Sequence, residues 1–183
     1  KAIDLFAPKK ITILGSGWLM DLPLNEISQK ADDICLIDIV HPPEVKSQTS
    51  VMKNVRLIEQ DVSGGLVEEV WKKAGRRTFL NRLHSLDDIL IPIYMPAEDP
   101  GLVISLNILT QLEILPEKLL RKKALASDEA FMNFRMDIQT KHINFLRNHN
   151  SVLISDTSEI ISGPGKTKSE RITAVAEIPP GRS

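Results

Sequence analysis

Two glycines and an aspartate near the start of the chain have the spacing of a site for a nucleotide-type ligand. Gly15-Ser16-Gly17 directly follows the apolar run 11–14, and a helix is expected soon after it. The glycines can adopt positive φ and let a ligand approach the main chain. The unpaired N–H groups at the start of the helix suit a phosphate or a carboxylate. Asp38 ends the next apolar run, where a carboxylate can accept hydrogen bonds from both ribose hydroxyls.

A second aspartate and one bulky residue help to choose between nucleotide ligands. Asp61 follows a third apolar run and is expected at the same sheet edge, where it could accept a hydrogen bond from an adenine amino group. A dinucleotide site prefers Gly-x-Gly-x-x-Gly, and the third glycine position holds Met20. A bulky side chain there would crowd helix against strand, which argues against a nicotinamide or flavin cofactor. A turn or helix-capping role is the alternative interpretation for Asp38.

The elements that would position these residues follow from hydrophobic periodicity. Five apolar runs rich in Ile, Val and Leu are predicted strands, although Arg56 interrupts the third: residues 11–14, 34–37, 55–58, 102–105 and 152–155. Helical spacing predicts helices near 24–28, 44–51, 66–73 and 127–148. Asp21 is expected to cap the first helix, and Ser127 or Asp128 the last. This alternation predicts an α/β fold, a Rossmann-like three-layer sandwich with a mostly parallel central sheet.

The composition is ordinary for a single globular domain spanning residues 1–183. Hydrophobic residues make up 42%, charged residues 26%, and the net charge is −1, so no strong field attracts nucleic acid or an anionic membrane. No apolar stretch approaches the roughly 20 residues that cross a bilayer. The lone Cys35 excludes a disulfide within the chain and fits a reducing, cytoplasmic location. No cluster of His, Cys and Asp has metal-ligand spacing.

Two segments have no clear regular structure. Prolines and aspartates break up residues 76–100, and so long a connection is typical of a functional lid or substrate loop, with an inserted hairpin as the alternative. Residues 162–171 are expected to form an exposed, mobile loop, and 172–178 a final edge strand antiparallel to the others.

The order of these features resembles the class I S-adenosylmethionine-dependent methyltransferases. In that family a glycine-rich turn follows the first strand, an acidic residue ends the second, and a further Asp often ends the third. The fourth strand delivers residues beside the methyl group. The matching cofactor-binding residues here are Gly15, Ser16, Gly17, Asp38, Asp61 and Ser105. The resemblance covers residues 11–156 and implies S-adenosylmethionine as cofactor, with a small molecule or a protein group as methyl acceptor.

The chain departs from the family pattern at several positions. Ile13 stands where an acidic residue often precedes the turn, and Leu19 where a third glycine is usual. The resemblance assigns Asp21 as the substitute acid that binds the methionine amino group. The fourth strand lacks the Asn-Pro-Pro-aromatic signature of amino-group methylation on bases or glutamine. Asn107 and Gln111 are instead expected to face the pocket.

Methyl transfer requires little catalytic machinery, because the sulfonium is already an activated donor that needs only to be held in line with the acceptor. A hydroxyl acceptor would benefit from a general base, for which His41 and His142 are the candidates, although a structural or surface role is favoured for both. Two other functions stay open. One is a Rossmann-like binding or scaffolding domain without catalysis, which Ile13 and Leu19 favour; the other is an NAD-binding oxidoreductase.

Overall fold

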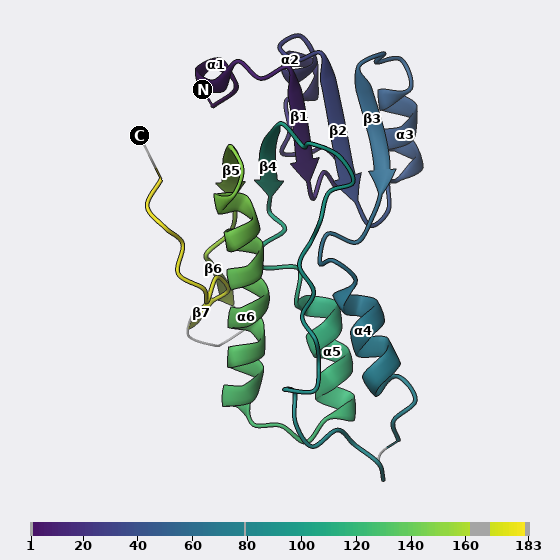
Figure 1. Ribbon diagram of the computed structural model, residues 1–183, viewed down its shortest axis with the longest axis vertical. Coiled ribbons are helices and arrows are strands. Elements are labelled where there is room, and N and C mark those ends of the chain that lie inside the picture. The colour runs from purple at the N-terminus through teal and green to yellow at the C-terminus, as the bar shows by residue number, and fades with distance from the viewer. Residues whose placement is uncertain (1, 79, 162–168, 182–183) are drawn as a thin grey trace.

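The chain forms one parallel five-stranded sheet with helices on both faces (Figure 1). The computed structural model describes residues 2–78, 80–161 and 169–181. The sheet has the order β3-β2-β1-β4-β5, and its strands are β1 (Lys10–Leu14), β2 (Asp33–Asp38), β3 (Val55–Glu59), β4 (Leu102–Leu106) and β5 (Ser151–Ile154). The strand order reverses at β1, which pairs with both β2 and β4. The carboxyl ends beside such a reversal form the usual ligand crevice of an open α/β sheet. This confirms the predicted Rossmann-like α/β fold.

The strands are where continuous apolar runs predicted them. β4 is buried along its whole length, β1 is buried except at its first residue, and β2 is buried except at its two end residues. β3 lies at the sheet edge and is less buried, and there Arg56 points outward to form a two-armed ion pair with Asp33, with both N–O distances 2.9 Å. The charge that interrupts this run therefore suits an edge strand.

Two short helices cover one face of the sheet, α2 (Leu24–Ser28) and α3 (Pro43–Thr49). Leu24, Ile27 and Val45 of these helices pack onto alternate residues of the central strands, among them Ile13 and Leu36. Burying one such side chain contributes roughly 1.5–3 kcal/mol. A further short helix, α1 (Ala2–Phe6), precedes the sheet.

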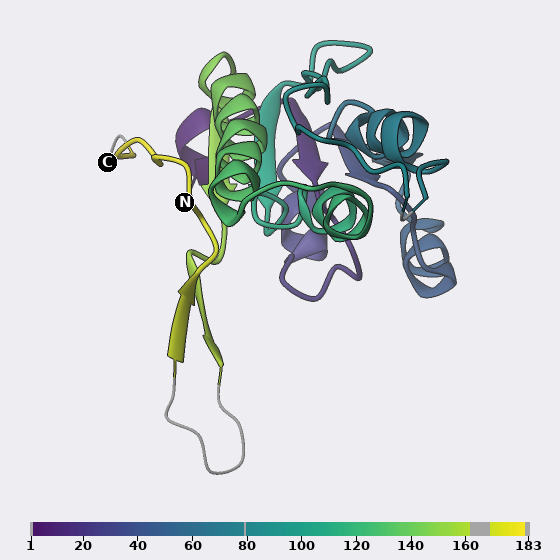
Figure 2. The same ribbon diagram turned by 90° about the horizontal axis from the view of Figure 1, so that it is seen from below.

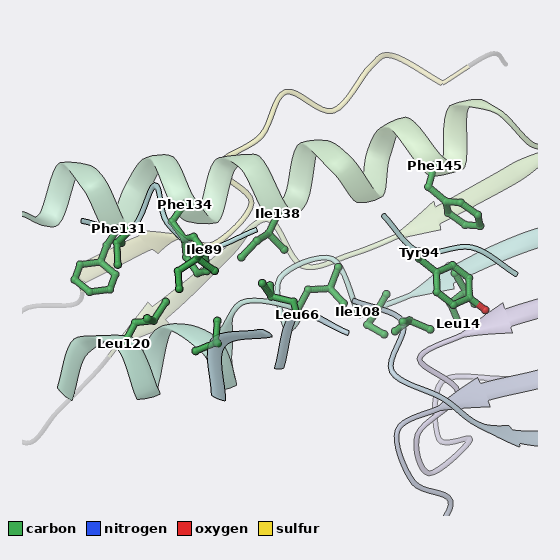
Figure 3. Packing of buried hydrophobic residues seen from close by; sticks show 14 of the residues in the cluster. Leu14, Leu66, Ile89, Tyr94, Ile108, Leu120, Phe131, Phe134, Ile138 and Phe145 are labelled. Atoms are coloured by element: carbon green, nitrogen blue, oxygen red, sulfur yellow. The ribbon is translucent and has the colours of Figure 1, made fainter. Parts of the chain in front are cut away.

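The other face carries the larger core, which continues beyond the carboxyl ends of the strands (Figure 3). Its helices are α4 (Leu66–Ala74), α5 (Ile114–Lys123) and α6 (Asp128–Arg147). The ring of Phe145, near the end of α6, meets Tyr94 edge-on, with centroids 5.2 Å apart. Ser127 caps α6 as expected, since its hydroxyl accepts a hydrogen bond of 3.1 Å from the Ala130 N–H.

The connection between α4 and β4 packs closely against the body without forming a helix or a strand in its described residues. Leu83, Leu86 and Ile89 belong to the large core. Lys141 of α6 donates a hydrogen bond to the carbonyl of Ile91. The connection is therefore anchored by its own apolar side chains, which the sequence pattern of 76–100 did not reveal.

Two local predictions were wrong, and one helix was not predicted. Asp21 does not cap α2, which begins after Pro23 without a side-chain cap. α5 was not expected. Instead of a final edge strand over 172–178, β7 (Ser169–Ile172) pairs antiparallel with β6 (Ser158–Ile161) in a separate hairpin, which projects from the body in Figure 2. Of the loop expected at 162–171, residues 162–168 lie outside the described residues and 169–171 belong to β7.

Candidate functional site

The turn after β1 packs tightly against the ends of the neighbouring strands β2 and β4. Gly15 has φ of 79°, and its N–H donates to the Ile37 carbonyl at 2.9 Å. A Cβ at Gly15 would lie only 2.5 Å from the carbonyl oxygen of Leu106. Gly17 has φ of 49° but open surroundings, with its nearest neighbours 4.0 Å from an added Cβ. Glycine is thus required at position 15 because φ is positive and because a Cβ would not fit there. At position 17 it is required only because φ is positive.

Asp38 joins this turn to the end of β2. Its Oδ2 accepts a hydrogen bond of 2.7 Å from the Gly17 N–H, and its Oδ1 accepts one of 2.7 Å from the Ile39 N–H. Among the described residues, no basic side chain forms an ion pair with it. Each carboxylate oxygen can accept a second hydrogen bond. The half-buried carboxylate therefore shapes the turn and can still bind a ligand.

Asp61 plays a similar part after β3. Its Oδ1 accepts hydrogen bonds from the N–H of Ser63 at 2.9 Å and from the Ser63 hydroxyl at 2.5 Å. The Ser63 hydroxyl in turn accepts from the Leu66 N–H at 3.1 Å, which supports the start of α4. Within the described chain, Asp61 Oδ2 has no hydrogen-bond donor. One oxygen of Asp61 therefore organises the turn and the other is free for a ligand.

A pocket of about 230 Å³ lies among the ends of β2, β3 and β4 and the start of α5. It brings together three residues chosen from the sequence: Asp38, Asp61 and Gln111. The remaining lining residues are Ile39, Val62, Ser63, Val67, Ile108, Leu112, Ile114, Leu115 and Pro116. The pocket is thus mainly apolar, with two carboxylates and no Lys or Arg among its described lining residues.

Sequence reasoning missed the apolar wall of this pocket, which comes from residues 108–116 after β4. These side chains carry no chemical signature, and only the chain's path brings them opposite Asp38 and Asp61. Ser63 was also missed. The pattern Asp61-Val62-Ser63, a short polar turn after a strand, was the signal that could have indicated it.

Two other predicted site residues, Asn107 and Asp21, form a hydrogen bond with each other outside the pocket lining. The Asn107 side chain donates a hydrogen bond of 3.2 Å to Asp21 Oδ2, linking the end of β4 to the segment after the glycine turn. Asn107 has φ of 51°, a conformation that asparagine tolerates better than most residues. Neither residue lines the pocket, so both belong to its surroundings.

Ser105 and both candidate histidines lie in the core. The Ser105 hydroxyl is 2.8 Å from His142 Nε2, and burial lowers the pKa of His142 to about 4. His41 is buried with Nε2 3.2 Å from the Ile58 carbonyl. Ser16 is also buried, and its hydroxyl has no hydrogen-bond partner among the described residues. None of these four side chains lines the pocket.

The bulky residues of the turn do not fill the pocket. Trp18 is 62% exposed and Met20 is 88% exposed. Leu19, at the position of the usual third glycine, is buried and has φ of 61°. The backbone thus adopts a glycine-like conformation at Leu19 although the residue is not glycine.

Comparisons with known proteins identify no relative: no family model, no curated protein and no solved structure matches the chain. Over residues 2–78, 80–161 and 169–181, no group of three or more His, Cys, Asp or Glu side chains could hold a metal ion. No helix in the same residues is long and apolar enough to cross a membrane. The fold and the pocket chemistry therefore carry the functional argument.

Proposed function

We propose that the pocket binds S-adenosylmethionine and that the protein is methyltransferase-like, acting on a small molecule or a protein group. The observation that carries this proposal is the position of Asp38. Its carboxylate lies in the pocket lining at the end of β2 while accepting a hydrogen bond from Gly17 N–H in the turn after β1. In a Rossmann-like sheet this is the place where a carboxylate meets ribose hydroxyls.

The charges of the pocket favour a ligand without phosphates. Among the lining residues that the structure describes, Asp38 and Asp61 alone are charged, and both are acidic. The Gly17 N–H, which could otherwise bind a phosphate, already donates to Asp38. A pyrophosphate would meet two carboxylates and one fewer main-chain donor, whereas a sulfonium cation is attracted by the carboxylates. These features support S-adenosylmethionine over NAD.

The polar and apolar groups divide the binding of such a ligand between them. Asp38 would accept hydrogen bonds from the ribose, and the free oxygen of Asp61 one from the adenine amino group. The apolar side chains of Val62, Leu112 and Leu115 would contact the base. The bound cofactor supplies an activated methyl group, so the protein needs chiefly to hold the acceptor in line with it.

A binding domain without catalysis is the second candidate. It is favoured by two hydrogen bonds in and just after β4, because the Ser105 side chain bonds to His142 and the Asn107 side chain bonds to Asp21. Among the residues considered for catalysis, Gln111 alone lines the pocket.

Calorimetric titration with S-adenosylmethionine, S-adenosylhomocysteine and NAD tests the proposal. We expect micromolar binding of both sulfur compounds and none of NAD. Asp38→Ala should abolish binding and Asp38→Asn, which keeps one acceptor oxygen for a main-chain N–H, should weaken it at least tenfold. Asp32→Asn, at an exposed position before β2, is the matched control and should bind like the wild type.

The outcomes separate the candidates. Tight binding of NAD alone would overturn the proposal in favour of an oxidoreductase. Binding of the sulfur compounds without methyl transfer to any member of a broad acceptor panel would indicate the non-catalytic binding domain. Failure of both sulfur compounds to bind a folded wild-type protein would remove the cofactor altogether.

A further inference from the structure

A buried glutamine connects the carboxy-terminal segment of the chain to the wall of the pocket. Gln139 of α6 is fully buried. Its Oε1 accepts hydrogen bonds from the N–H groups of Val175 at 2.7 Å and Ala176 at 3.1 Å. Its Nε2 donates to the Thr173 carbonyl and to Glu113 Oε1, both at 3.0 Å. One side-chain amide therefore uses its two donors and two acceptor positions to link two distant parts of the chain.

Arg135, one turn earlier in α6, makes the same connection in parallel. Its Nη2 donates to the Thr173 carbonyl at 3.2 Å. Its Nε lies 3.5 Å from Glu113 Oε1 and 3.7 Å from Glu117 Oε2. Arg135, Glu113 and Glu117 are all buried. Buried charges are tolerated when they are paired and hydrogen-bonded, so these contacts hold the side chains in one arrangement.

Glu113 is the point at which this network reaches the pocket. It lies between Leu112 and Ile114, which both line the pocket, and it immediately precedes α5. Its Oε2 has no hydrogen-bond partner in the described part of the chain. The carboxylate is therefore oriented through Oε1, by Gln139 and Arg135.

Apolar contacts reinforce the connection beside this polar network. Ala174 and Ala176 pack in a small core with Leu109 and Ile143. Leu109 follows Ile108, another residue of the pocket lining. The carboxy-terminal segment is thus connected to the stretch after β4 at two places. Its alanines pack beside Leu109 at the start of that stretch, and Gln139 and Arg135 link it to Glu113 at the end.

From this arrangement we infer that residues 173–176 regulate the pocket, with Gln139 as the positioning residue between them. When the segment is docked on Gln139, residues 111–116 of the apolar wall are held in their binding position. When the segment is released, Gln139 and Arg135 lose their main-chain partners, the hold on Glu113 loosens, and the affinity of the pocket falls. The effect on affinity rests on the proposed function; the effect on the wall does not.

An exchange of side chains between positions 113 and 139 tests the link directly. Gln139→Glu keeps an acceptor for Val175 and Ala176 but replaces the donor toward Glu113 with a second carboxylate oxygen. The double variant Glu113→Gln/Gln139→Glu places a donor on position 113 and an acceptor on position 139, which restores that hydrogen bond. The Thr173 carbonyl keeps its donor from Arg135 in both variants.

The first measurement is hydrogen exchange, without any ligand, at the main-chain amides of residues 111–117, of which Pro116 has none. We expect exchange at least about tenfold faster in Gln139→Glu and restored to near the wild-type rate in the double variant. Ile138→Val, which removes one buried methylene from the same helix, controls for general loss of stability and should leave these amides unchanged relative to the rest of the sheet. Unchanged exchange in Gln139→Glu, or faster exchange that the double variant does not restore, would overturn the inference.

The second measurement separates the segment from the glutamine. Val175→Pro removes the N–H that donates a hydrogen bond to Gln139. Glu177→Pro places a proline two residues later, at an exposed position whose N–H donates no hydrogen bond to any residue that the structure describes. Val175→Pro should speed exchange at 111–117 and weaken binding of S-adenosylhomocysteine about fivefold or more, the usual lower range of coupling between sites. Glu177→Pro should do neither.

The two proposals fail in different ways. If wild-type protein does not bind S-adenosylhomocysteine but exchange responds as expected, the proposed function falls and the structural coupling stands. If the ligand binds and neither Gln139→Glu nor Val175→Pro changes its affinity, the regulatory inference falls and the proposed function stands.

Discussion

The hydroxyl of Ser105 lies 2.8 Å from Nε2 of His142, joining the carboxyl-terminal half of β4 to α6 within the core. Both residues are buried, and burial lowers the pKa of His142 to about 4 from its ordinary 6.5. The imidazole is therefore uncharged near neutral pH. A pair that looked from the sequence like a cofactor contact and a possible base forms a hydrogen bond inside the fold.

Stability should fall in mild acid because of this histidine. Between pH 6.5 and about 4 the unfolded chain binds a proton at His142 that the folded protein does not, so the free energy of unfolding decreases as the pH drops through this window. The full loss is about 3 kcal/mol, at 1.36 kcal/mol for each unit of pKa difference. Urea unfolding from pH 7 to pH 4 measures it. His142→Gln should flatten this part of the profile, while the exposed control His84→Gln should leave it unchanged.

Two of the buried serines, Ser105 and Ser16, should respond oppositely to alanine. Ser105→Ala leaves His142 Nε2 without its partner and should lower the free energy of unfolding by about 1–3 kcal/mol. Ser16→Ala removes a buried hydroxyl that lacks a partner in the described residues, and should be neutral or stabilising by about 1 kcal/mol. Thermal and urea unfolding of the ligand-free proteins compare them. Clear destabilisation by Ser16→Ala would mean that the hydroxyl has a partner after all.

The two glycines of the turn should also be unequal. Gly15→Ala combines positive φ with a Cβ placed 2.5 Å from the Leu106 carbonyl, and should cost about 3 kcal/mol or more. Gly17→Ala meets no atom closer than 4.0 Å and should cost about 1 kcal/mol, from φ alone. Equal losses in urea unfolding would show that the packing of Gly15 against β4 is not as described.

At Leu19 we expect glycine to destabilise the protein less than alanine does, the reverse of the usual order. Leu19→Ala removes a buried side chain and keeps a residue with a Cβ at φ of 61°, whereas Leu19→Gly removes the side chain and relieves the backbone. The stability order should therefore be Leu, then Gly, then Ala, with Gly about 1 kcal/mol above Ala. Chemical denaturation of the three proteins checks this order. Alanine above glycine would argue against the left-handed conformation at this position.

The framework of the fold was predictable because its strands are continuous apolar runs. Even the exception was informative, since Arg56 marks the edge strand β3. The helix α5 was missed because its sequence, which includes Pro116 and three consecutive basic residues from Arg121, has only a narrow buried side. The β6–β7 hairpin was missed because a pairing partner, not local pattern, decides whether a short polar stretch becomes a strand.

The candidate site was predictable only in part. The strand-end positions of Asp38 and Asp61 follow from the parallel sheet, so their approach at one edge could be expected. Their actual hydrogen bonds could not, because the contact of Asp38 with Gly17 depends on the path of the turn between them. The same holds for Ser105, whose place in a strand was correctly predicted while the direction of its side chain was not.

The long connection before β4 is attached to the carboxyl ends of the strands at Tyr94 and to their amino ends at Glu98. Tyr94 donates its hydroxyl hydrogen to Gln60 at 3.3 Å, just past the end of β3, whereas Glu98 binds Lys10 and Arg56 at the starts of β1 and β3. The long side chains of Tyr94 and Glu98 let this short stretch contact both ends of the strands. It also runs behind the turn after Asp61, where a Cβ at Gly64 would touch the Ile93 carbonyl. Breaking the ion pairs of Glu98 should therefore loosen a connection that, at its other end, packs against the turn between Asp61 and α4.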